Sequence, residues 1–421
     1  HVDFVIRGEG ERAFVEFLRH LKGERSLDQV PNLSYRKDGA FFSTPLGENF
    51  PIDELAFPDL SDFSLSNYTL AKKPMTFMIT SRSCPHKCSF CSVHTTFGTD
   101  YRRRPLENVL EEIELRYRQG YRVIDFEDDN LTYYKNTFKE LCRRLIERFP
   151  NRELEFVAMN GISYLSLDDE LLELMRRAGF SHLNLALVSS DKSVRETTKR
   201  PHTLEAYLKV VHKAHALGFQ IVSYQILGLP NETLDSMIQT LAFNARLPVL
   251  LGASPYYQTP DAPITRGLVL TAEDYVKARL TAMAIETEEF SRDDIYTLFV
   301  TTRIINFLKG LPLTVSTEFT DLLGCEWNDT RTQAGFELLK RFADTQKLYF
   351  WSKQQLIENR HFSSAIFLRV LSQAELIRCQ NGRSIHIKDW ALIPMQRRES
   401  ADLRSLTSDL WSVRGDRAQR I

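Results

Sequence analysis

One stretch decides the fold: Ser83-Cys84-Pro85-His86-Lys87-Cys88-Ser89-Phe90-Cys91. It follows the apolar run 75–80, Met-Thr-Phe-Met-Ile-Thr, which predicts a buried strand. The spacing Cys-x3-Cys-x2-Cys gathers three thiols in one loop, and cysteine thiolates are the ligands of iron–sulfur clusters. A cubane of four irons normally takes four cysteines, so three would leave one iron open to a small molecule. The loop therefore predicts a reactive metal site on Cys84, Cys88 and Cys91.

A zinc site is the alternative. His86 or His94 could complete a zinc shell, since cysteine and histidine at short spacing also suit zinc. Zinc knuckles usually bring a second cysteine or histidine pair downstream, and no such pair follows here. This alternative predicts a zinc-stabilised binding module in which the run 102–104, three arginines, contacts RNA or a protein.

The three cysteines, with Phe90 just before the third, resemble the signature of the radical S-adenosylmethionine (SAM) superfamily. The resemblance implies a 4Fe-4S cluster whose open iron binds SAM. It also implies that one electron, delivered by a donor such as flavodoxin or ferredoxin, cleaves SAM to methionine and a 5′-deoxyadenosyl radical.

Composition narrows the class of protein. The 421 residues are 43% hydrophobic, enough for a barrel-sized domain and a smaller one, and the formal net charge is −1. That balance predicts no global attraction to nucleic acid or to an anionic membrane, and no apolar stretch reaches the roughly 20 residues of a membrane span. Six cysteines in so long a chain do not predict a disulfide framework, so we expect a reducing compartment, the cytoplasm.

Strand and helix patterns alternate from Met75 onward, which predicts parallel strands joined by crossover helices. The predicted strands are 75–80, 122–127, 154–158, 182–188, 220–227 and 249–253, and the predicted helices begin at 106 and cover 134–149, 168–178, 204–217 and 232–246. We therefore predict an α/β fold, a partial (β/α)6 TIM-type barrel over residues 74–269, with its chemistry at the carboxyl ends of the strands.

The segments outside the barrel carry further predictions. Residues 1–23 resemble the end of the cobalamin-binding domain that precedes many radical SAM enzymes, so we expect an upstream domain and cobalamin in the full-length protein. The Asp-x-His-x-x-Gly motif that would supply a histidine to cobalt is not in these residues. Residues 24–73 read as a proline-rich linker, 270–395 as a mostly helical cap domain, and 396–421 as a charged tail.

Polar residues after the strands are candidates to bind SAM. Asp128, in the acidic run 127–129, could bind the ribose or the ammonium group, or instead hold backbone amides of its own loop. Ser189 remains as a donor where relatives carry Gly-Ile-Glu-Ser, because Ala186 and Val188 replace the glycine and the glutamate. Arg200 could pair with the methionine carboxylate, or only balance local acids.

The run Gly228-Leu229-Pro230-Asn231-Glu232-Thr233 resembles the Gly-Leu-Pro-Gly-Glu-Thr turn of the same superfamily. The resemblance implies that Ile226 packs the adenine and that Gly228 lets the backbone approach it. With Phe90, these residues complete the predicted SAM site.

The predicted activity is a cobalamin-dependent methyl transfer to an unactivated carbon. A cobalamin-independent rearrangement, cyclisation or oxidation begun by the same radical is the alternative within the superfamily. The substrate, a small molecule or a peptide, and the oligomeric state are not encoded in any motif that we recognise.

Overall fold

The computed structural model describes residues 2–200, 203–259, 262–269, 271–274, 285–352 and 355–388. The chain forms two compact units, which we describe one at a time. The first unit comprises His1–Ala186, Thr198–Phe219 and Thr259–Gly267, and the second comprises Leu187–Thr197, Gln220–Gln258 and Leu268–Ile421. The predicted tail, 396–421, and the last residues of the predicted cap lie outside the described residues. No helix within the described ranges is long and apolar enough to cross a membrane.

A parallel sheet forms the centre of the first unit. Strand β8 (Val123–Phe126) lies between β5 (Lys73–Met78) and β9 (Glu155–Val157), and both pairings are parallel. A parallel bridge from Ile162 to Leu185 continues this order to β10 (His182–Val188). These strands lie where the apolar runs predict them. Their carboxyl ends share one edge, where the loops after β5 and β8 are neighbours.

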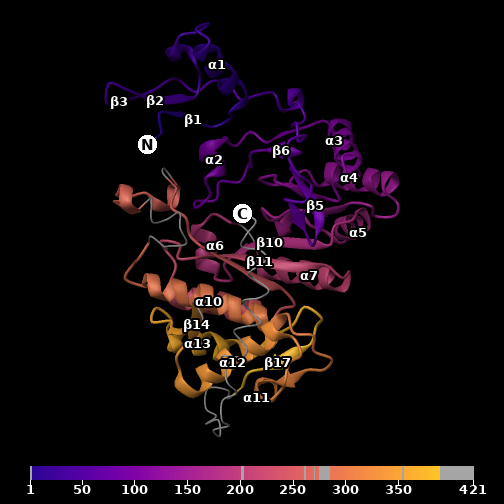
Figure 1. The fold of residues 1–421 in the computed structure, drawn as a ribbon, viewed down its shortest axis with the longest axis vertical. Coiled ribbons are helices and arrows are strands. Elements are labelled where there is room, and N and C mark those ends of the chain that lie inside the picture. Colours follow the sequence, from indigo (N-terminus) through magenta and orange to yellow (C-terminus); the bar gives the residue numbers. More distant parts are fainter. Residues whose placement is uncertain are drawn as a thin grey trace. The chain divides into compact units, whose positions relative to one another are not determined.

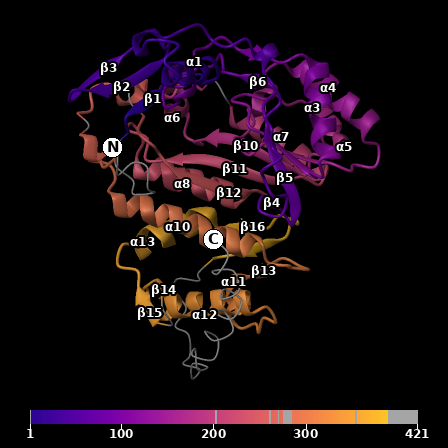
Figure 2. The same ribbon diagram turned by 45° about the horizontal axis from the view of Figure 1, so that its top comes forward.

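Helices α3 (Leu106–Arg118), α4 (Lys135–Arg148), α5 (Asp169–Ala178) and α7 (Leu204–Ala216) are the crossovers, as predicted. Figures 1 and 2 show α3, α4 and α5 side by side near β5. Each helix buries its apolar face, and α3 buries Val109, Leu110 and Ile113 at helical spacing. Gly179, with φ 117°, ends α5, because a side chain there would strike the Leu154 carbonyl.

The N-terminal segment of the first unit is a small antiparallel sheet with one helix. Strand β2 (Leu33–Lys37) pairs with β1 (Phe4–Ile6) on one side and with β3 (Ala40–Ser43) on the other. Helix α1 (Glu11–Leu21) follows β1 after a short turn. The region predicted as a linker, residues 24–73, thus contains the β2–β3 hairpin. It also contains the short strand β4 (Thr69–Leu70), which belongs to the central sheet and pairs with β5.

The second unit contains the last two predicted strands of the barrel pattern. Strand β11 (Gln220–Leu227) pairs in parallel with β12 (Leu250–Pro255), and α8 (Leu234–Ala245) connects them. Thr233 caps α8 with a reciprocal pair of hydrogen bonds to Ser236. Strands therefore occupy all six predicted positions, which confirms the mixed α/β content and the repeating order.

The C-terminal part of the second unit is richer in β-structure than predicted. Its helices are α10 (Arg292–Lys309), α11 (Phe319–Leu323), α12 (Thr330–Thr345) and α13 (Ser364–Ala374). Its strands are β13 (Thr317–Glu318), β14 (Tyr349–Ser352), β15 (Gln355–Glu358), β16 (Leu376–Arg378) and β17 (Ser384–His386). They form a sheet of order β13-β17-β16 and the separate pair β14-β15. The hairpin that the sequence predicts near residues 384–393 extends beyond the described residues, and β17 pairs antiparallel with β16. The boundaries of the predicted domains stay predictions.

Candidate metal centre

The cluster loop, residues 83–91, begins at a strained residue. Ser83 has φ 72°, in the left-handed region that residues other than glycine rarely adopt. Its N–H donates to a carboxylate oxygen of Asp129 at 2.9 Å, and its hydroxyl donates to the Gly98 carbonyl at 2.6 Å. These two bonds hold the strained conformation and fix the direction in which the chain enters Cys84.

Backbone hydrogen bonds anchor the rest of the cluster loop. The Cys91 N–H donates to the Cys88 carbonyl at 3.1 Å and closes a turn between the two ligands. The Ser89 N–H donates to the Thr198 carbonyl at 3.1 Å, and the Ile264 N–H donates to the Ser89 carbonyl at 3.0 Å. The loop is therefore held from two distant parts of the first unit, which limits the positions open to its thiols.

Each of the three thiol sulfurs receives an N–H group. The donors are Asn130 Nδ2, 3.4 Å from Cys84 Sγ, Arg200 Nη1, 3.9 Å from Cys88 Sγ, and the Val93 backbone for Cys91. Hydrogen bonds to the sulfurs are one of the features that tune iron–sulfur clusters. The arrangement thus fits thiolate ligands of a cluster. The sequence suggested Asn130 only as a residue that holds backbone amides, and it did not predict the contacts of Asn130 and Val93 with the sulfurs.

Burial governs the charge of the thiols. It raises the pKa of Cys88 and of Cys91, while the Arg200 guanidinium opposes the rise at Cys88. The two thiols are therefore protonated in the metal-free protein, and thiolate ligation must release protons. All six cysteines are free of disulfides.

Zinc is the alternative occupant of this site. Throughout the described ranges, no group of three or more histidine, cysteine, aspartate or glutamate residues is arranged to hold one metal ion, and this is true of Cys84, Cys88 and Cys91 as well. His86 instead packs edge-on against the Tyr133 ring, with 6.0 Å between the ring centroids. Three thiols without a fourth protein ligand fit a cluster with an open iron better than they fit tetrahedral zinc.

The acidic run 127–129 acts on the backbone of the same loop. Asp128 is buried and accepts hydrogen bonds from the Thr80 N–H at 3.0 Å, the Thr80 hydroxyl at 2.7 Å and the Ser81 hydroxyl. Burial raises its pKa to about 6, and these donors oppose the rise. These contacts hold Thr80 and Ser81, which precede the cluster loop, and not the loop that carries Asp128 itself. Direct binding of SAM by Asp128 stays a prediction.

Arg200 connects the cluster loop to the central sheet. Its Nη2 donates to the Ala186 carbonyl at 2.8 Å, while its Nη1 lies against Cys88. Phe90 is half-buried in the loop itself. The first unit thus brings together the three cysteines, Phe90, Asp128 and Arg200, whereas pairing of Arg200 with the methionine carboxylate stays a prediction.

Ser189 lies in the second unit and follows a residue with unusual backbone geometry. Val188 has φ 72°, a rare conformation for a β-branched residue. The buried Ser189 hydroxyl lies 3.2 Å from the Thr240 hydroxyl, within hydrogen-bonding distance. Its role as a SAM donor stays a prediction, since the observed partner is a protein side chain.

Gly228 also lies in the second unit, at the end of β11. Its φ is 81°, and an added Cβ would come within 3.1 Å of Ile295 Cδ1, so both the backbone and the packing favour glycine. Its N–H points at the Met237 sulfur at 3.1 Å. Ile226, two residues earlier, is half-buried in the strand. The close approach observed here is to protein, and the adenine contacts of both residues stay predictions.

Glu232 is a buried acid that the sequence reading did not select. It accepts a hydrogen bond from the Leu229 N–H at 3.4 Å, within the turn that follows β11. Burial raises its pKa to about 8, so it is mostly protonated at neutral pH. A glutamate directly before the helix cap Thr233 was the available signal, but its burial depends on packing that the pattern does not show.

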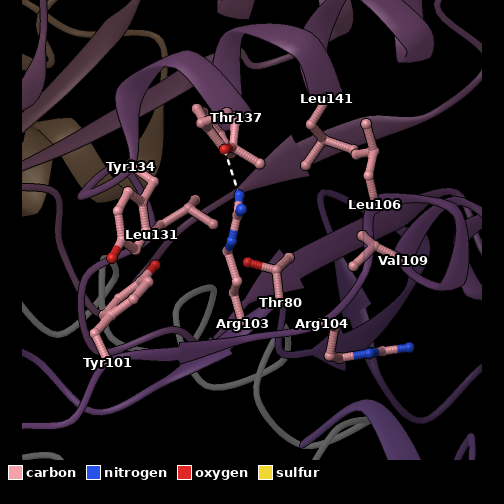
Figure 3. Close-up of a pocket in the computed structure, with 11 residues that line it drawn as sticks. Thr80, Tyr101, Arg103, Arg104, Leu106, Val109, Leu131, Tyr134, Thr137 and Leu141 are labelled. Carbon is pink, nitrogen blue, oxygen red and sulfur yellow. Dashed lines mark hydrogen bonds between the residues drawn. The ribbon is translucent and has the colours of Figure 1, made fainter.

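The arginine run 102–104 lines two cavities in the first unit, and its members have separate partners. Arg102 pairs with Glu9, Arg104 pairs with the buried Glu112 at 2.6 Å, and Arg103 bonds to the Thr137 hydroxyl and stacks on Tyr134. Figure 3 shows Arg103 reaching Thr137 at the smaller cavity, of about 40 Å³. The larger cavity, of about 550 Å³, also has Pro51, Ile52 and Asp53 in its wall. Two of the three guanidinium groups are thus paired with carboxylates, which leaves little of the run's charge for an external anion.

Comparisons with known proteins agree with the cysteine loop. A model of the Radical SAM superfamily matches residues 78–243. An uncharacterized methyltransferase of Pyrococcus horikoshii is 27% identical over 280 residues, which cover 64% of this chain and 60% of that protein. The cytidylyl-2-hydroxyethylphosphonate methyltransferase of Streptomyces wedmorensis is 28% identical over 264 residues, which cover 55% of this chain and 48% of that protein.

A solved structure shares the fold. The cobalamin-dependent SAM radical enzyme OxsB, with aqua-cobalamin and SAM bound, matches with a TM-score of 0.55 at 14% identity, over 97% of this chain and 64% of that one. The chain spans about half to three-fifths of the length of the curated methyltransferases that it matches. The family match begins at the end of β5 and includes all three cysteines. Residues 78–243 of this chain therefore form a radical SAM domain.

Proposed function

We propose that this chain is the radical-generating part of a cobalamin-dependent methyltransferase that acts on an unactivated carbon. The observation that carries the proposal is the set of three cysteines at the carboxyl edge of a parallel sheet, each with an N–H donor at its sulfur. The two relatives, both methyltransferases, support methyl transfer, and the fold shared with a cobalamin-dependent enzyme supports cobalamin.

The residues on the first unit would hold the cluster and prepare its surroundings. Cys84, Cys88 and Cys91 would ligate three irons, and the donors at their sulfurs would stabilise the charge of the ligands. When bound, the cluster would supply the electron that cleaves SAM to methionine and a 5′-deoxyadenosyl radical. Arg200, beside Cys88, is placed to add positive charge next to that site.

Two partners follow from this proposal. An electron donor such as flavodoxin or ferredoxin would reduce the cluster, and a small molecule or a peptide would be the methyl acceptor. We also propose a cytoplasmic location, which the six free cysteines support because exposed and cluster-binding thiols persist in a reducing compartment.

The proposal is tested on the full-length protein purified without oxygen, with dithionite and SAM added. We expect 5′-deoxyadenosine as a product, and we expect cobalt to copurify with the chain. 5′-Deoxyadenosine without cobalt would favour the cobalamin-independent alternative. Iron-free protein that leaves SAM intact would contradict the proposal.

A further inference from the structure

Two arginines face each other at the base of the cluster loop. Strand β6 (Ser81–Arg82) leads into the loop and pairs antiparallel with β7 (Arg102–Arg103), and the register places Arg82 directly opposite Arg102. Both side chains are largely buried, at 17% and 15% exposure. Like charges directly opposite each other on neighbouring strands destabilise the pairing. This strand pair therefore requires a counter-charge.

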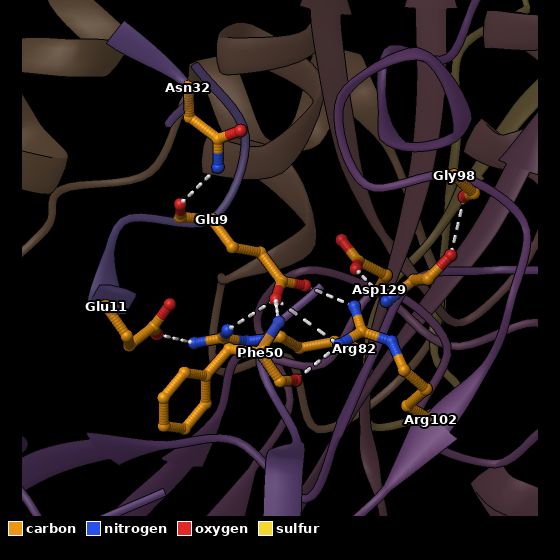
Figure 4. A network of polar contacts seen from close by, with 9 residues as sticks. Glu9, Glu11, Asn32, Phe50, Arg82, Gly98, Arg102 and Asp129 are labelled. Carbon is orange, nitrogen blue, oxygen red and sulfur yellow. Dashed lines mark hydrogen bonds and ion pairs between the residues drawn. The ribbon is translucent and has the colours of Figure 1, made fainter. Parts of the chain in front are cut away.

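Glu9, from the N-terminal segment, supplies that charge. One carboxylate oxygen lies 3.5 Å from Arg82 Nη1, and the other pairs with Arg102 Nη2. The same carboxylate accepts the Phe50 N–H at 2.7 Å, and the side chain is only 5% exposed. Glu11 pairs with the remaining Nη2 of Arg82. Figure 4 shows the Glu9 carboxylate between the two guanidinium groups.

The turn that carries Glu9 is built to reach this position. Gly8 has φ 71°, and a Cβ added there would lie 3.5 Å from the carbonyl oxygen of Thr96, which follows the cluster loop in α2 (Val93–Thr96). The Asn32 side chain donates to the Glu9 carbonyl at 3.3 Å and holds the turn beside the start of β2. The N-terminal segment thus contacts Arg82 before the cluster loop and passes near Thr96 after it.

The contact passes directly to the first cysteine. Arg82 precedes Ser83, whose strained backbone is held by Asp129, and Cys84 comes next. Because strain of this kind persists only where the surroundings enforce it, a loosened Arg82 would release Ser83 and the entry to the loop.

We propose that Glu9 is a positioning residue for the cluster loop. That the loop binds an iron–sulfur cluster rests on the proposed function. The charge of Glu9 holds Arg82 and Arg102 together and so fixes the approach of Cys84. By this contact, a movement of the N-terminal segment would change the geometry of the metal site.

The first test uses the metal-free, full-length chain, so that it does not depend on cluster chemistry. Hydrogen exchange of peptides covering residues 81–91 is compared in wild type, Glu9→Gln, Arg102→Gln and the double variant. We expect Glu9→Gln to speed exchange about tenfold or more, the effect of losing a hydrogen bond to a charged group. In the double variant Arg82 no longer faces a second positive charge and keeps its pair with Glu11, so most of the protection should return. Glu16→Gln, which alters an ion pair elsewhere on α1, is the matched control and should change nothing.

Two results would overturn the proposal: exchange in Glu9→Gln within about twofold of wild type, or a double variant at least as labile as the single one. If Glu9→Gln does not fold, the double variant should fold, and its failure would also count against the proposal. The reconstituted protein gives a second readout. The midpoint potential of its cluster should rise in Glu9→Gln, which removes a negative charge, and should return to the wild-type value in the double variant. If Glu9 had a purely structural role, the potential would not follow the net charge in this way. Absence of a cluster in wild type would refute the proposed function while leaving the exchange result to be judged separately.

Discussion

The ends of strands β8 and β11 each bury a carboxyl group, yet the two groups have different surroundings. Asp128, after β8, accepts hydrogen bonds from the Thr80 N–H and from the hydroxyls of Thr80 and Ser81, and its pKa is raised to about 6. Glu232, after β11, has backbone donors from its own turn, and its pKa is raised to about 8. At neutral pH the first group is mostly charged and the second is mostly neutral.

This difference shows that one sequence feature, an acidic residue after a strand, can have two different structural roles. In the first unit the charge organises the chain that enters the cysteine loop, because its partners, Thr80 and Ser81, lie between the end of β5 and that loop. In the second unit the neutral acid stabilises a turn beside a glycine with positive φ. Substitutions that change the charge at each strand end test this difference.

The largest effect is expected at the ion pair that supports the first unit. Glu112 is buried between Arg104 and Arg116, and Arg104 also donates to the Ile79 carbonyl after β5. Glu112→Gln would leave two buried guanidinium groups without their carboxylate, which costs about 3 to 5 kcal/mol. Hydrogen exchange of the α3 peptide measures the loss. Glu111→Gln, at the exposed neighbouring position, is the control, and equal effects at both positions would refute the assignment.

The next effect is a change in pH dependence in the second unit. Because the pKa of Glu232 is raised from 4.5 to about 8, the native state holds more protons than the unfolded state between these values, and stability falls as the pH rises through that range. Glu232→Gln should remove this fall, a change of a few kcal/mol at about 1.4 kcal/mol per pKa unit. The free energy of unfolding, measured with a denaturant from about pH 5 to about pH 8, gives this pH dependence. Glu326→Gln, at an exposed site, is the control. A slope unchanged by the substitution would show that Glu232 is charged in the native state.

A smaller effect, a direct loss of stability, is expected at Asp128. Its carboxylate accepts hydrogen bonds from the Thr80 N–H and from two hydroxyls, and an amide NH2 group cannot accept, so Asp128→Asn should destabilise the first unit by roughly 2 kcal/mol. Faster exchange in peptides covering residues 79–84 would report it. Stabilisation by this substitution would mean that Asp128 resembles Glu232, and the contrast between the two strand ends would fail.

The smallest effect is expected at Ser189. Its hydroxyl is buried beside that of Thr240, so Ser189→Ala should cost about 1 kcal/mol and leave the iron content unchanged. The affinity for SAM, measured by calorimetry on the reconstituted protein, is the informative quantity. A large loss of affinity would support Ser189 as a SAM donor, whereas no loss would leave it a structural residue.

Much of the fold could be predicted because it depends on local patterns. The apolar runs and helical spacings located all six strands of the barrel pattern and the crossover helices, and the cysteine spacing lies within the residues that the superfamily model matches. The contributions that were missed depend on contacts between residues far apart in the chain. Asn130 reaches Cys84 across 46 positions, and Glu9 reaches Arg102 across 93.

The central claim is that three cysteines of one loop hold a single cluster, and the iron content of cysteine variants tests it most directly. Cys84→Ala, Cys88→Ala and Cys91→Ala are compared with Cys325→Ser, which changes an exposed cysteine of the second unit. After anaerobic reconstitution, the account predicts about four irons per chain in wild type and in Cys325→Ser, and near-complete loss in each of the other three. Full iron in any of those three, or its loss in Cys325→Ser, would contradict the account.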